Sequence, residues 1–475
     1  MSATQRLNRS EDRVQLVGSN KGTARGSPLE IPRVTSRKVV GLDAALWLIA
    51  LSASLAAPIL PELAGVGTAD ILLGLLVLIF GIGAFLEHGG RYLTGAGIYT
   101  LTASFFIGTS LLYFHSTNPT PITSIDLYNA GIWSFWATAA IYLFWLRRSR
   151  YLRAPTAPRL SRSVTSFARN YALILLAVGL GMHYGRIRLG TIDTGATFDG
   201  AILLAASFVI GAKRRQPVWR VLISALALAL YIVSQFHGGG RLVLADLGFG
   251  FLLLVQPRIR FRQVKLSVLV LTIPVLVIFA LIGQSRPGAP TTEAASGLSS
   301  VVTPLQNYDE EVNLSLDHGG VRPLVADATF FVPRSVYPSK YLGFGRTLAQ
   351  DLQPQIYSDS GGIQSLASLN SGEWFYIAGW AGILIMIPFT GFVFLLIDRL
   401  WFARLARLRS SSGLLVILAL VVLAAGAPDL SWAGPDTWWG RATPRLLVLI
   451  PGAIWLVLPR RTPMRHRTEL APEEP

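Results

Sequence analysis

The sequence contains no cysteine and very little charge. Without cysteine the chain can have no disulfide, no thiol chemistry and no cysteine-based metal site. Only 14% of the 475 residues are charged, while 52% are hydrophobic and the mean hydropathy is +0.49. This composition is too apolar for a soluble protein of the same length, so we predict a membrane protein that crosses the bilayer many times.

Motifs of soluble nucleotide-dependent enzymes are also missing. The sequence has no Walker A loop, no His-Glu-x-x-His, no Gly-x-Ser-x-Gly and no dinucleotide-binding glycine pattern. His, Asp and Glu residues do not recur at metal-ligand spacing. We therefore expect no metal and no cofactor. Residues 1–38 lack the apolar centre of a signal peptide, and we expect them to form a disordered cytoplasmic tail.

Long apolar runs predict an all-α integral membrane fold with about twelve transmembrane helices. The runs fall at about 39–60, 69–86, 95–114, 129–146, 170–185, 197–212, 218–236, 242–255, 266–283, 373–397, 413–427 and 443–458. They predict five regions: tail 1–38, helices 1–9 in 39–283, a large loop with short helices in 284–372, helices 10–12 in 373–458, and tail 459–475.

The distribution of Lys and Arg predicts the orientation of the chain. With the N-terminus inside, 32 of the 42 basic residues fall in inner segments, as the positive-inside rule requires. Both termini are then cytoplasmic, and loop 284–372 is extracytoplasmic. The formal net charge of +16 is explained by these inner segments beside anionic lipid head groups, so we expect the lipid bilayer as a partner and no nucleic acid.

Ten basic residues remain on or near the predicted outer side, against the topological preference. They are Arg186, Arg188, Arg241, Arg286, Arg322, Arg334, Lys340, Arg346, Arg441 and Arg445. Their position indicates that something on this side favours positive charge.

Arg241 follows three consecutive glycines and lies five residues before Asp246. Glycines let the backbone approach a ligand closely, and a guanidinium binds phosphate through a planar fork of donors. A carboxylate inside the membrane is costly unless it is paired or lies in a wet cavity. Two interpretations stay open, namely a structural Arg241–Asp246 pair and a functional role for both residues.

The loop 284–372 contains a distinctive segment that follows a predicted short amphipathic helix. Pro323 suits the first turn of that helix, and Pro333 ends it. The segment reads Phe331-Val-Pro-Arg334-Ser-Val-Tyr-Pro-Ser-Lys340-Tyr-Leu-Gly-Phe-Gly345, in which Arg334 and Gly345 are separated by ten residues. Arg286 and Gly297 have the same separation.

Two further features flank the last predicted helices. Glu373 is expected at the N-terminus of the tenth helix, where it would complement the helix dipole. Residues 428–441 are expected to form an outer loop rich in Trp. We interpret these Trp side chains as an interfacial belt, with stacking on sugar rings as the alternative.

The topology and the segment 331–345 resemble the bacterial oligosaccharide repeat-unit polymerases, the Wzy-type O-antigen polymerases, and the related O-antigen ligases. The resemblance implies a GT-C-like membrane glycosyltransferase in the bacterial cytoplasmic membrane, with its active site on the extracytoplasmic side. Its donor and acceptor would be glycans on undecaprenyl diphosphate. A chain-length regulator is an expected protein partner.

The same resemblance implies an inverting, metal-independent transfer in which guanidinium groups stabilise the leaving diphosphate. The candidates for this role are Arg241, Arg286 and Arg334, supported by Lys340 and Arg346. The candidates for a general base at the acceptor hydroxyl are His318, Glu373 and Asp327.

Two other functions fit the same sequence. The first is an O-antigen-type ligase, which would move a finished lipid-linked glycan to a different acceptor. The second is a polysaccharide or lipid transporter, in which Asp246 would be a coupling carboxylate.

Overall fold

The structure is a computed structural model, and it is helical throughout the residues that it describes. These residues are 39–117, 124–149, 160–187, 192–210, 218–235, 242–257, 264–271, 322–329, 332, 336–341, 343–352, 355, 358, 366–405 and 410–457. Within these ranges there is no β-strand, which confirms the prediction of an all-α fold. The roles predicted for the two tails concern residues outside these ranges.

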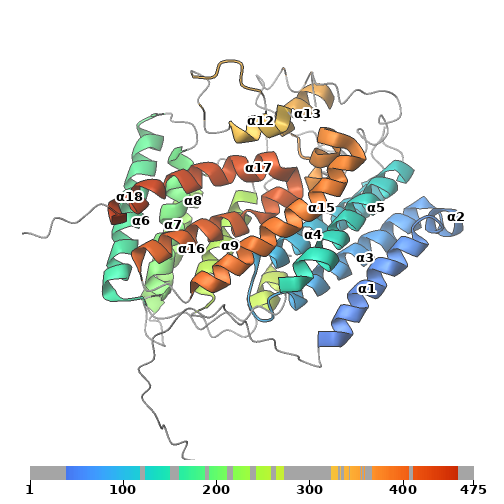
Figure 1. Cartoon of the computed structure of the whole chain (residues 1–475), viewed down its shortest axis with the longest axis horizontal. Helices are drawn as coiled ribbons and strands as arrows, with labels where there is room; N and C mark the ends of the chain where they lie inside the picture. The colour runs from blue at the N-terminus through green and yellow to red at the C-terminus, as the bar shows by residue number, and fades with distance from the viewer. Residues whose placement is uncertain are drawn as a thin grey trace, which may run out of the picture. The chain divides into compact units, whose positions relative to one another are not determined.

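Among the described residues up to 257, the structure has nine α-helices, and α5 continues into a π-helical and a 3-10 turn over residues 141–149 (Figure 1). They are α1 (Val39–Ala56), α2 (Leu60–Ala64), α3 (Val66–Glu87), α4 (Gly95–Thr117), α5 (Ser124–Ala140), α6 (Arg162–Tyr184), α7 (Ile192–Ile210), α8 (Val218–Gln235) and α9 (Leu242–Val255). The second half contributes α12 (Arg322–Ala328), α13 (Phe344–Leu352), α15 (Leu369–Leu405), α16 (Ser411–Ala425), α17 (Ala427–Leu447) and α18 (Ile450–Val457). Helix α12 carries Pro323 in its first turn, where the sequence predicts a short helix.

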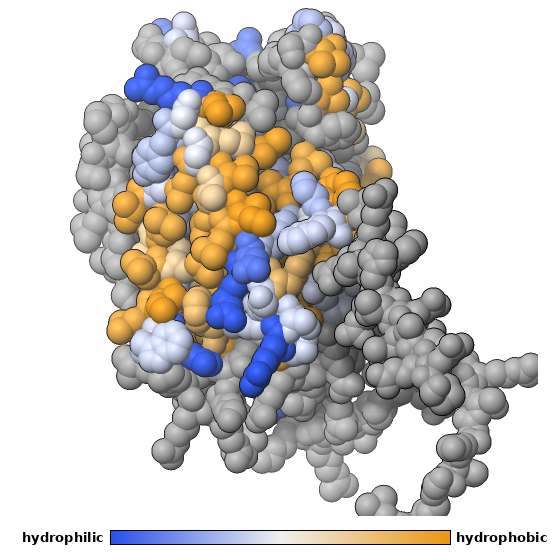
Figure 2. All heavy atoms as spheres, turned by 90° about the vertical axis from the view of Figure 1, so that its left-hand side faces the viewer, coloured by the Kyte–Doolittle hydropathy of each residue, from blue (hydrophilic) through white to orange (hydrophobic). Residues whose placement is uncertain are grey.

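Six described helical segments are long and apolar enough to cross a membrane, judged by length and composition. They are α3, residues 95–112 of α4, α6, α7, α15, and the segment Ala427–Val457. Figure 2 shows one face of the molecule, on which a broad band of hydrophobic side chains covers the helices. Exposed residues such as Leu173 and Trp455 are typical of a membrane-facing surface. The described helices thus support a helical membrane protein, while the number twelve stays a prediction.

Helices α15 and α17 are both interrupted. Helix α15 breaks at Ala378 and Gly379, and α17 breaks at Gly434, where φ is +77°. Pro435 follows Gly434 and suits the first turn of the second half of α17. Residues 428–441 are therefore helical and largely buried, so the prediction of an outer loop there is wrong. Helices α12 and α13 both pack on α17 (Figure 1).

The turn between α3 and α4 is held by buried side chains from distant parts of the chain. The Asp398 carboxylate accepts hydrogen bonds from the backbone N–H groups of Gly95 and Ala96, at 2.8 and 3.1 Å, and so caps the N-terminus of α4. The Lys265 ammonium donates to the carbonyls of Phe85, Leu86 and His88 at the C-terminus of α3. Both charges therefore complement helix dipoles.

Candidate functional site

Five charged residues meet around α17, and we call them the α17 charge cluster. They are Asp199 of α7, Asp246 of α9, and Asp429, Arg441 and Arg445 of α17. Four of them are buried, with exposed fractions of 0% for the three aspartates and 4% for Arg445. Ionisable groups are rare inside a helical membrane protein and usually mark a functional site.

The two arginines of the cluster lie four residues apart, on one face of the second half of α17. The guanidinium of Arg445 donates to the Asp246 carboxylate at 3.0 Å and lies 3.7 Å from the centre of the Phe198 ring. Arg441 donates to the Asp429 carboxylate. Since Asp429 precedes Gly434 and Arg441 follows it, this ion pair links the two halves of the broken helix.

Several carboxylate oxygens of the cluster have no hydrogen-bonding partner among the described residues. Neither carboxylate oxygen of Asp199 hydrogen-bonds to any residue that the structure describes, although Asp199 lies within electrostatic reach of Arg445. The Oδ1 atom of Asp246 is likewise unsatisfied within the described chain. Three carboxylates face two guanidiniums, so the cluster carries one excess negative charge if every group is ionised.

The break in α17 contacts Glu373 of α15 on one side and Gly343 of the segment 331–345 on the other, and we call this place the junction. The Asp436 backbone N–H donates to both oxygens of the Glu373 carboxylate, at 3.2 and 3.3 Å. A Cβ atom on Gly434 would lie 2.0 Å from Glu373 Oε2, so only glycine fits there. On the other side of the junction, a Cβ atom on Gly343 would lie 2.6 Å from Asp436 Oδ2.

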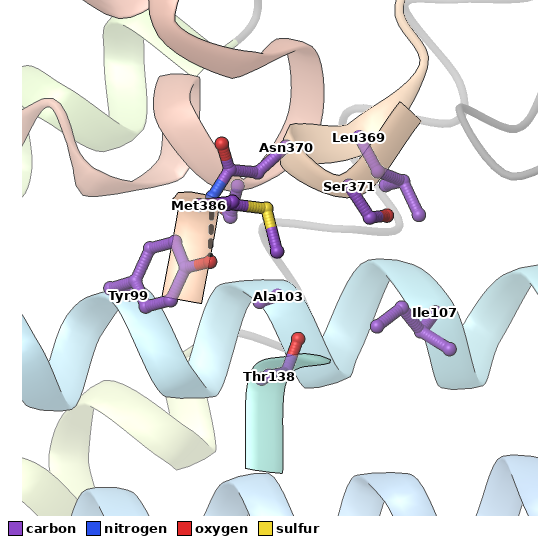
Figure 3. Close-up of a pocket in the computed structure, with 9 residues that line it drawn as sticks. Tyr99, Ala103, Ile107, Thr138, Leu369, Asn370, Ser371 and Met386 are labelled. Carbon is purple, nitrogen blue, oxygen red and sulfur yellow. Dashed lines mark hydrogen bonds between the residues drawn. The ribbon is translucent and has the colours of Figure 1, made fainter. Parts of the chain in front are cut away.

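A small polar cavity lies at the start of α15 (Figure 3). Asn370, which lines it, is three residues before Glu373 in the sequence. Its volume of about 10 Å³ suits a single water molecule. Asn370 donates to the Tyr99 hydroxyl at 2.9 Å and to Thr390 at 3.3 Å, while its own Oδ1 is buried and unsatisfied within the described residues. Leu369, which also lines the cavity, has a φ of +57°, a strained value for a bulky residue.

The predicted site residues are only partly within the described ranges. Arg241, Arg286, Arg334 and His318 lie outside them. Asp327 is part of α12, and its side chain is not among those described.

Two of the predicted supporting cations have described side chains. Lys340 donates to the Val332 carbonyl at 3.3 Å, and Arg346 is exposed on α13. Neither lies in the α17 charge cluster, and their roles stay predictions.

Glu373 lies elsewhere in its helix than the sequence indicates. Helix α15 begins at Leu369, so Glu373 is past the first turn and does not complement the dipole of α15. It is fully buried and accepts a hydrogen bond from the Asp436 N–H group at the break in α17 instead. Because its carboxylate binds the backbone of α17 and is buried, Glu373 is less suited to act as a general base than the sequence indicates.

The described partner of Asp246 is Arg445, 199 residues away in sequence. The predicted Arg241–Asp246 pair stays a prediction, since Arg241 lies outside the described residues. Sequence reasoning missed Asp199 and Asp429 because each lies at the edge of a predicted span. The available signal was the pair Arg441 and Arg445, two basic residues at helical spacing on the side where positive charge is disfavoured.

Comparison with known proteins gave no relative for this chain. No protein-family model, curated protein or solved structure matches it.

Proposed function

We propose that this protein is a membrane glycosyltransferase that polymerises undecaprenyl-diphosphate-linked oligosaccharide repeat units into a surface polysaccharide. The proposal rests on the segment 331–345 and its resemblance to repeat-unit polymerases. One structural observation supports it: this segment ends against the broken helix α17, where Gly343 lies next to the Asp436 side chain.

The contact between the segment and α17 is close. Gly343 lies against the Asp436 carboxylate with no room for a side chain. The next residue, Phe344, is buried with its ring 5.2 Å from the ring of Tyr376 in α15. The end of the segment is thus held between the two interrupted helices, which favours a role at a site rather than a free surface loop.

The chemistry of the proposed reaction suits this region. Breaking the bond between a sugar and a diphosphate builds negative charge on the leaving group, and fixed guanidinium groups stabilise that charge. Arg241, Arg286 and Arg334 are the proposed diphosphate ligands, with Lys340 and Arg346 in support. Arg441 of α17 is partly exposed, with 31% of its side chain accessible, and its guanidinium is paired with the Asp429 carboxylate.

Glycan analysis of a strain that lacks the gene tests the proposal. Loss of polymer with accumulation of single lipid-linked repeat units is the expected result. Long polymer left on the lipid carrier would instead identify the ligase alternative. Unchanged glycans, combined with altered movement of a solute or lipid, would contradict both transferase functions.

Arg334 is the residue whose substitution tests the diphosphate role. If its guanidinium binds the diphosphate through two donors, Arg334→Ala should lower polymer formation about 100- to 1000-fold, and Arg334→Lys should restore little of it. Arg186→Ala is the matched control because this exposed arginine lies in the turn that follows α6. Near-normal polymer in Arg334→Ala, at equal protein level, would remove Arg334 from the site.

A transporter is the second candidate, and the α17 charge cluster favours it. Transporters place carboxylates and interrupted helices in the membrane, where they bind coupling ions and substrates. In that case Asp246→Asn should abolish pH-driven movement of the substrate in vesicles. A polymerase with Asp246→Asn should still join purified repeat units in detergent, where no gradient exists.

A further inference from the structure

Asp436 lies at the break in α17, next to Pro435 at the start of the second half of the helix. Its side chain is partly exposed, and it forms neither a hydrogen bond nor an ion pair with any side chain or backbone group that the structure describes. This distinguishes it from Asp199, Asp246 and Asp429, which are fully buried. Because it is partly exposed, the Asp436 carboxylate at this junction lies where a ligand can reach it.

The backbone, and not the side chain, fixes the position of Asp436. Its N–H group is held by Glu373, and Gly434 makes room for that contact. Gly343 makes room on the side of the segment 331–345. Replacing the Asp436 side chain with an isosteric amide therefore leaves these contacts intact.

Trp439 lies three residues after Asp436, so the two side chains share one face of the helix. Its exposed fraction is 36%, whereas the neighbouring Trp438 is buried and donates to the Leu423 carbonyl at 3.1 Å. Trp432 points into the bundle, with its ring 4.8 Å from that of Phe106. Of the three, Trp439 has the most accessible ring. An accessible indole face stacks well on the apolar face of a sugar ring.

We propose that Asp436 and Trp439 form the acceptor-sugar site of the polymerase. This inference rests on the proposed function. The Trp439 ring stacks on the terminal sugar of the acceptor, and the Asp436 carboxylate accepts a hydrogen bond from its hydroxyl group.

The acceptor hydroxyl oxygen attacks the anomeric carbon of the donor and forms the new glycosidic bond. The bond from that carbon to the diphosphate oxygen breaks, and its electron pair leaves with the diphosphate. The hydroxyl proton passes to Asp436, which later releases it to water.

Purified variants that act on lipid-linked repeat units extracted from the deletion strain test the site. We expect Asp436→Asn to lower kcat about 100-fold or more, the usual contribution of a general base. Trp439→Ala should raise the apparent KM about tenfold, and Trp439→Phe should restore most of the binding. The control variants are Asp193→Asn at the start of α7 and Trp455→Ala on the exposed face of α18.

The Asp436→Asn variant also separates catalysis from helix capping. Asn caps a helix as well as Asp does, so a purely structural Asp436 would tolerate this change with unchanged kcat. A base would instead lose the acidic limb of its pH–rate profile. Unchanged kcat and pH profile in Asp436→Asn, or an equal loss in the two control variants, would overturn the inference.

Two outcomes separate an error in the proposed acceptor site from an error in the proposed polymerase function. If the deletion strain accumulates no lipid-linked repeat unit, the polymerase function itself is wrong. If the repeat unit accumulates and the Asp436→Asn and Trp439→Ala variants polymerise it normally, the polymerase stands and only this acceptor site is wrong.

Discussion

The turn between α3 and α4 and the α17 charge cluster both bury charges, but they satisfy them in opposite ways. In the turn, the Asp398 carboxylate and the Lys265 ammonium each bind backbone groups at a helix end. In the α17 charge cluster, side chains mainly face other side chains, and Asp199 has no hydrogen-bonding partner among the described residues. Both regions lie within the same helical bundle.

The difference separates structural burial of charge from burial that serves function. Helix ends carry unsatisfied backbone groups in every protein, so a buried charge placed there replaces the lost water. A carboxylate placed against other carboxylates gains no such replacement and costs stability. We infer that the α3–α4 turn holds the fold together and that the α17 charge cluster is kept for activity.

The largest expected effect is that of Arg445→Leu. Its loss leaves Asp246 and Asp199 without their guanidinium, and an uncompensated buried charge costs about 3–5 kcal/mol. Thermal unfolding of the purified protein in mild detergent measures this loss. Adding Asp246→Asn to Arg445→Leu should recover part of it. The exposed control Arg186→Leu should stay within about 0.5 kcal/mol of the unchanged protein.

Lys265→Met should give the next largest effect. The substitution keeps most of the side-chain volume but leaves the carbonyls at the end of α3 without their donor, which costs about 2–3 kcal/mol. The same unfolding assay measures it, and polymer formation per folded molecule should not change. A drop in activity without a drop in stability would show that this turn is not merely structural.

Asp398→Asn should have a smaller effect in the same turn. The amide retains one oxygen for the N–H groups at the start of α4 but presents an NH₂ group to the other, so we expect a loss of about 1–2 kcal/mol. Asp398→Leu, which removes both acceptors, should cost more. Equal stability of the two variants would mean that Asp398 does not act through these hydrogen bonds.

Asp199→Asn should have the smallest effect on stability and yet alter activity. Because neither oxygen of Asp199 is hydrogen-bonded within the described chain, the neutral amide should change stability by less than about 0.5 kcal/mol or increase it. Turnover should fall if the cluster serves activity. A loss of more than about 2 kcal/mol would place Asp199 with the structural charges and remove the distinction between the two regions.

The helices themselves were well predicted from hydropathy, because a lipid-facing helix needs a long apolar run. Helices α3, α6 and α7 all overlap predicted spans. The start of the short helix α12 was also predicted, because Pro323 has a clear preference for a first turn. Its predicted end at Pro333 is wrong, since α12 ends at Ala328.

Helix α17 could not be predicted in the same way. Its sequence contains Pro428, Gly434 and Pro435 together with several charges, which is the usual composition of a loop. The segment is helical because Gly434 adopts a positive φ, Glu373 binds the freed N–H group and the charges pair with partners on other helices. None of these compensations is visible along the chain, since each depends on a contact far away in sequence.

For the candidate site, the sequence predicts which types of residue are involved but not which residues contact one another. Basic residues on the disfavoured side indicate that something there favours positive charge, and for Arg441 and Arg445 the described partners are the carboxylates of Asp429 and Asp246. The identity of their partners depends on tertiary packing between α7, α9 and α17.

The pairing of Asp246 with Arg445 also sets an order of events during synthesis. The chain is made from its N-terminus, and the two residues are 199 positions apart. At a typical synthesis rate Asp246 exists for roughly 10–40 s before Arg445 does. Throughout that interval α7 and α9 carry carboxylates with no arginine of α17 to meet them. A nascent chain that stops before Arg441 lacks both guanidiniums. The buried carboxylates of α7 and α9 therefore gain their ionic partners only when the last helices are complete.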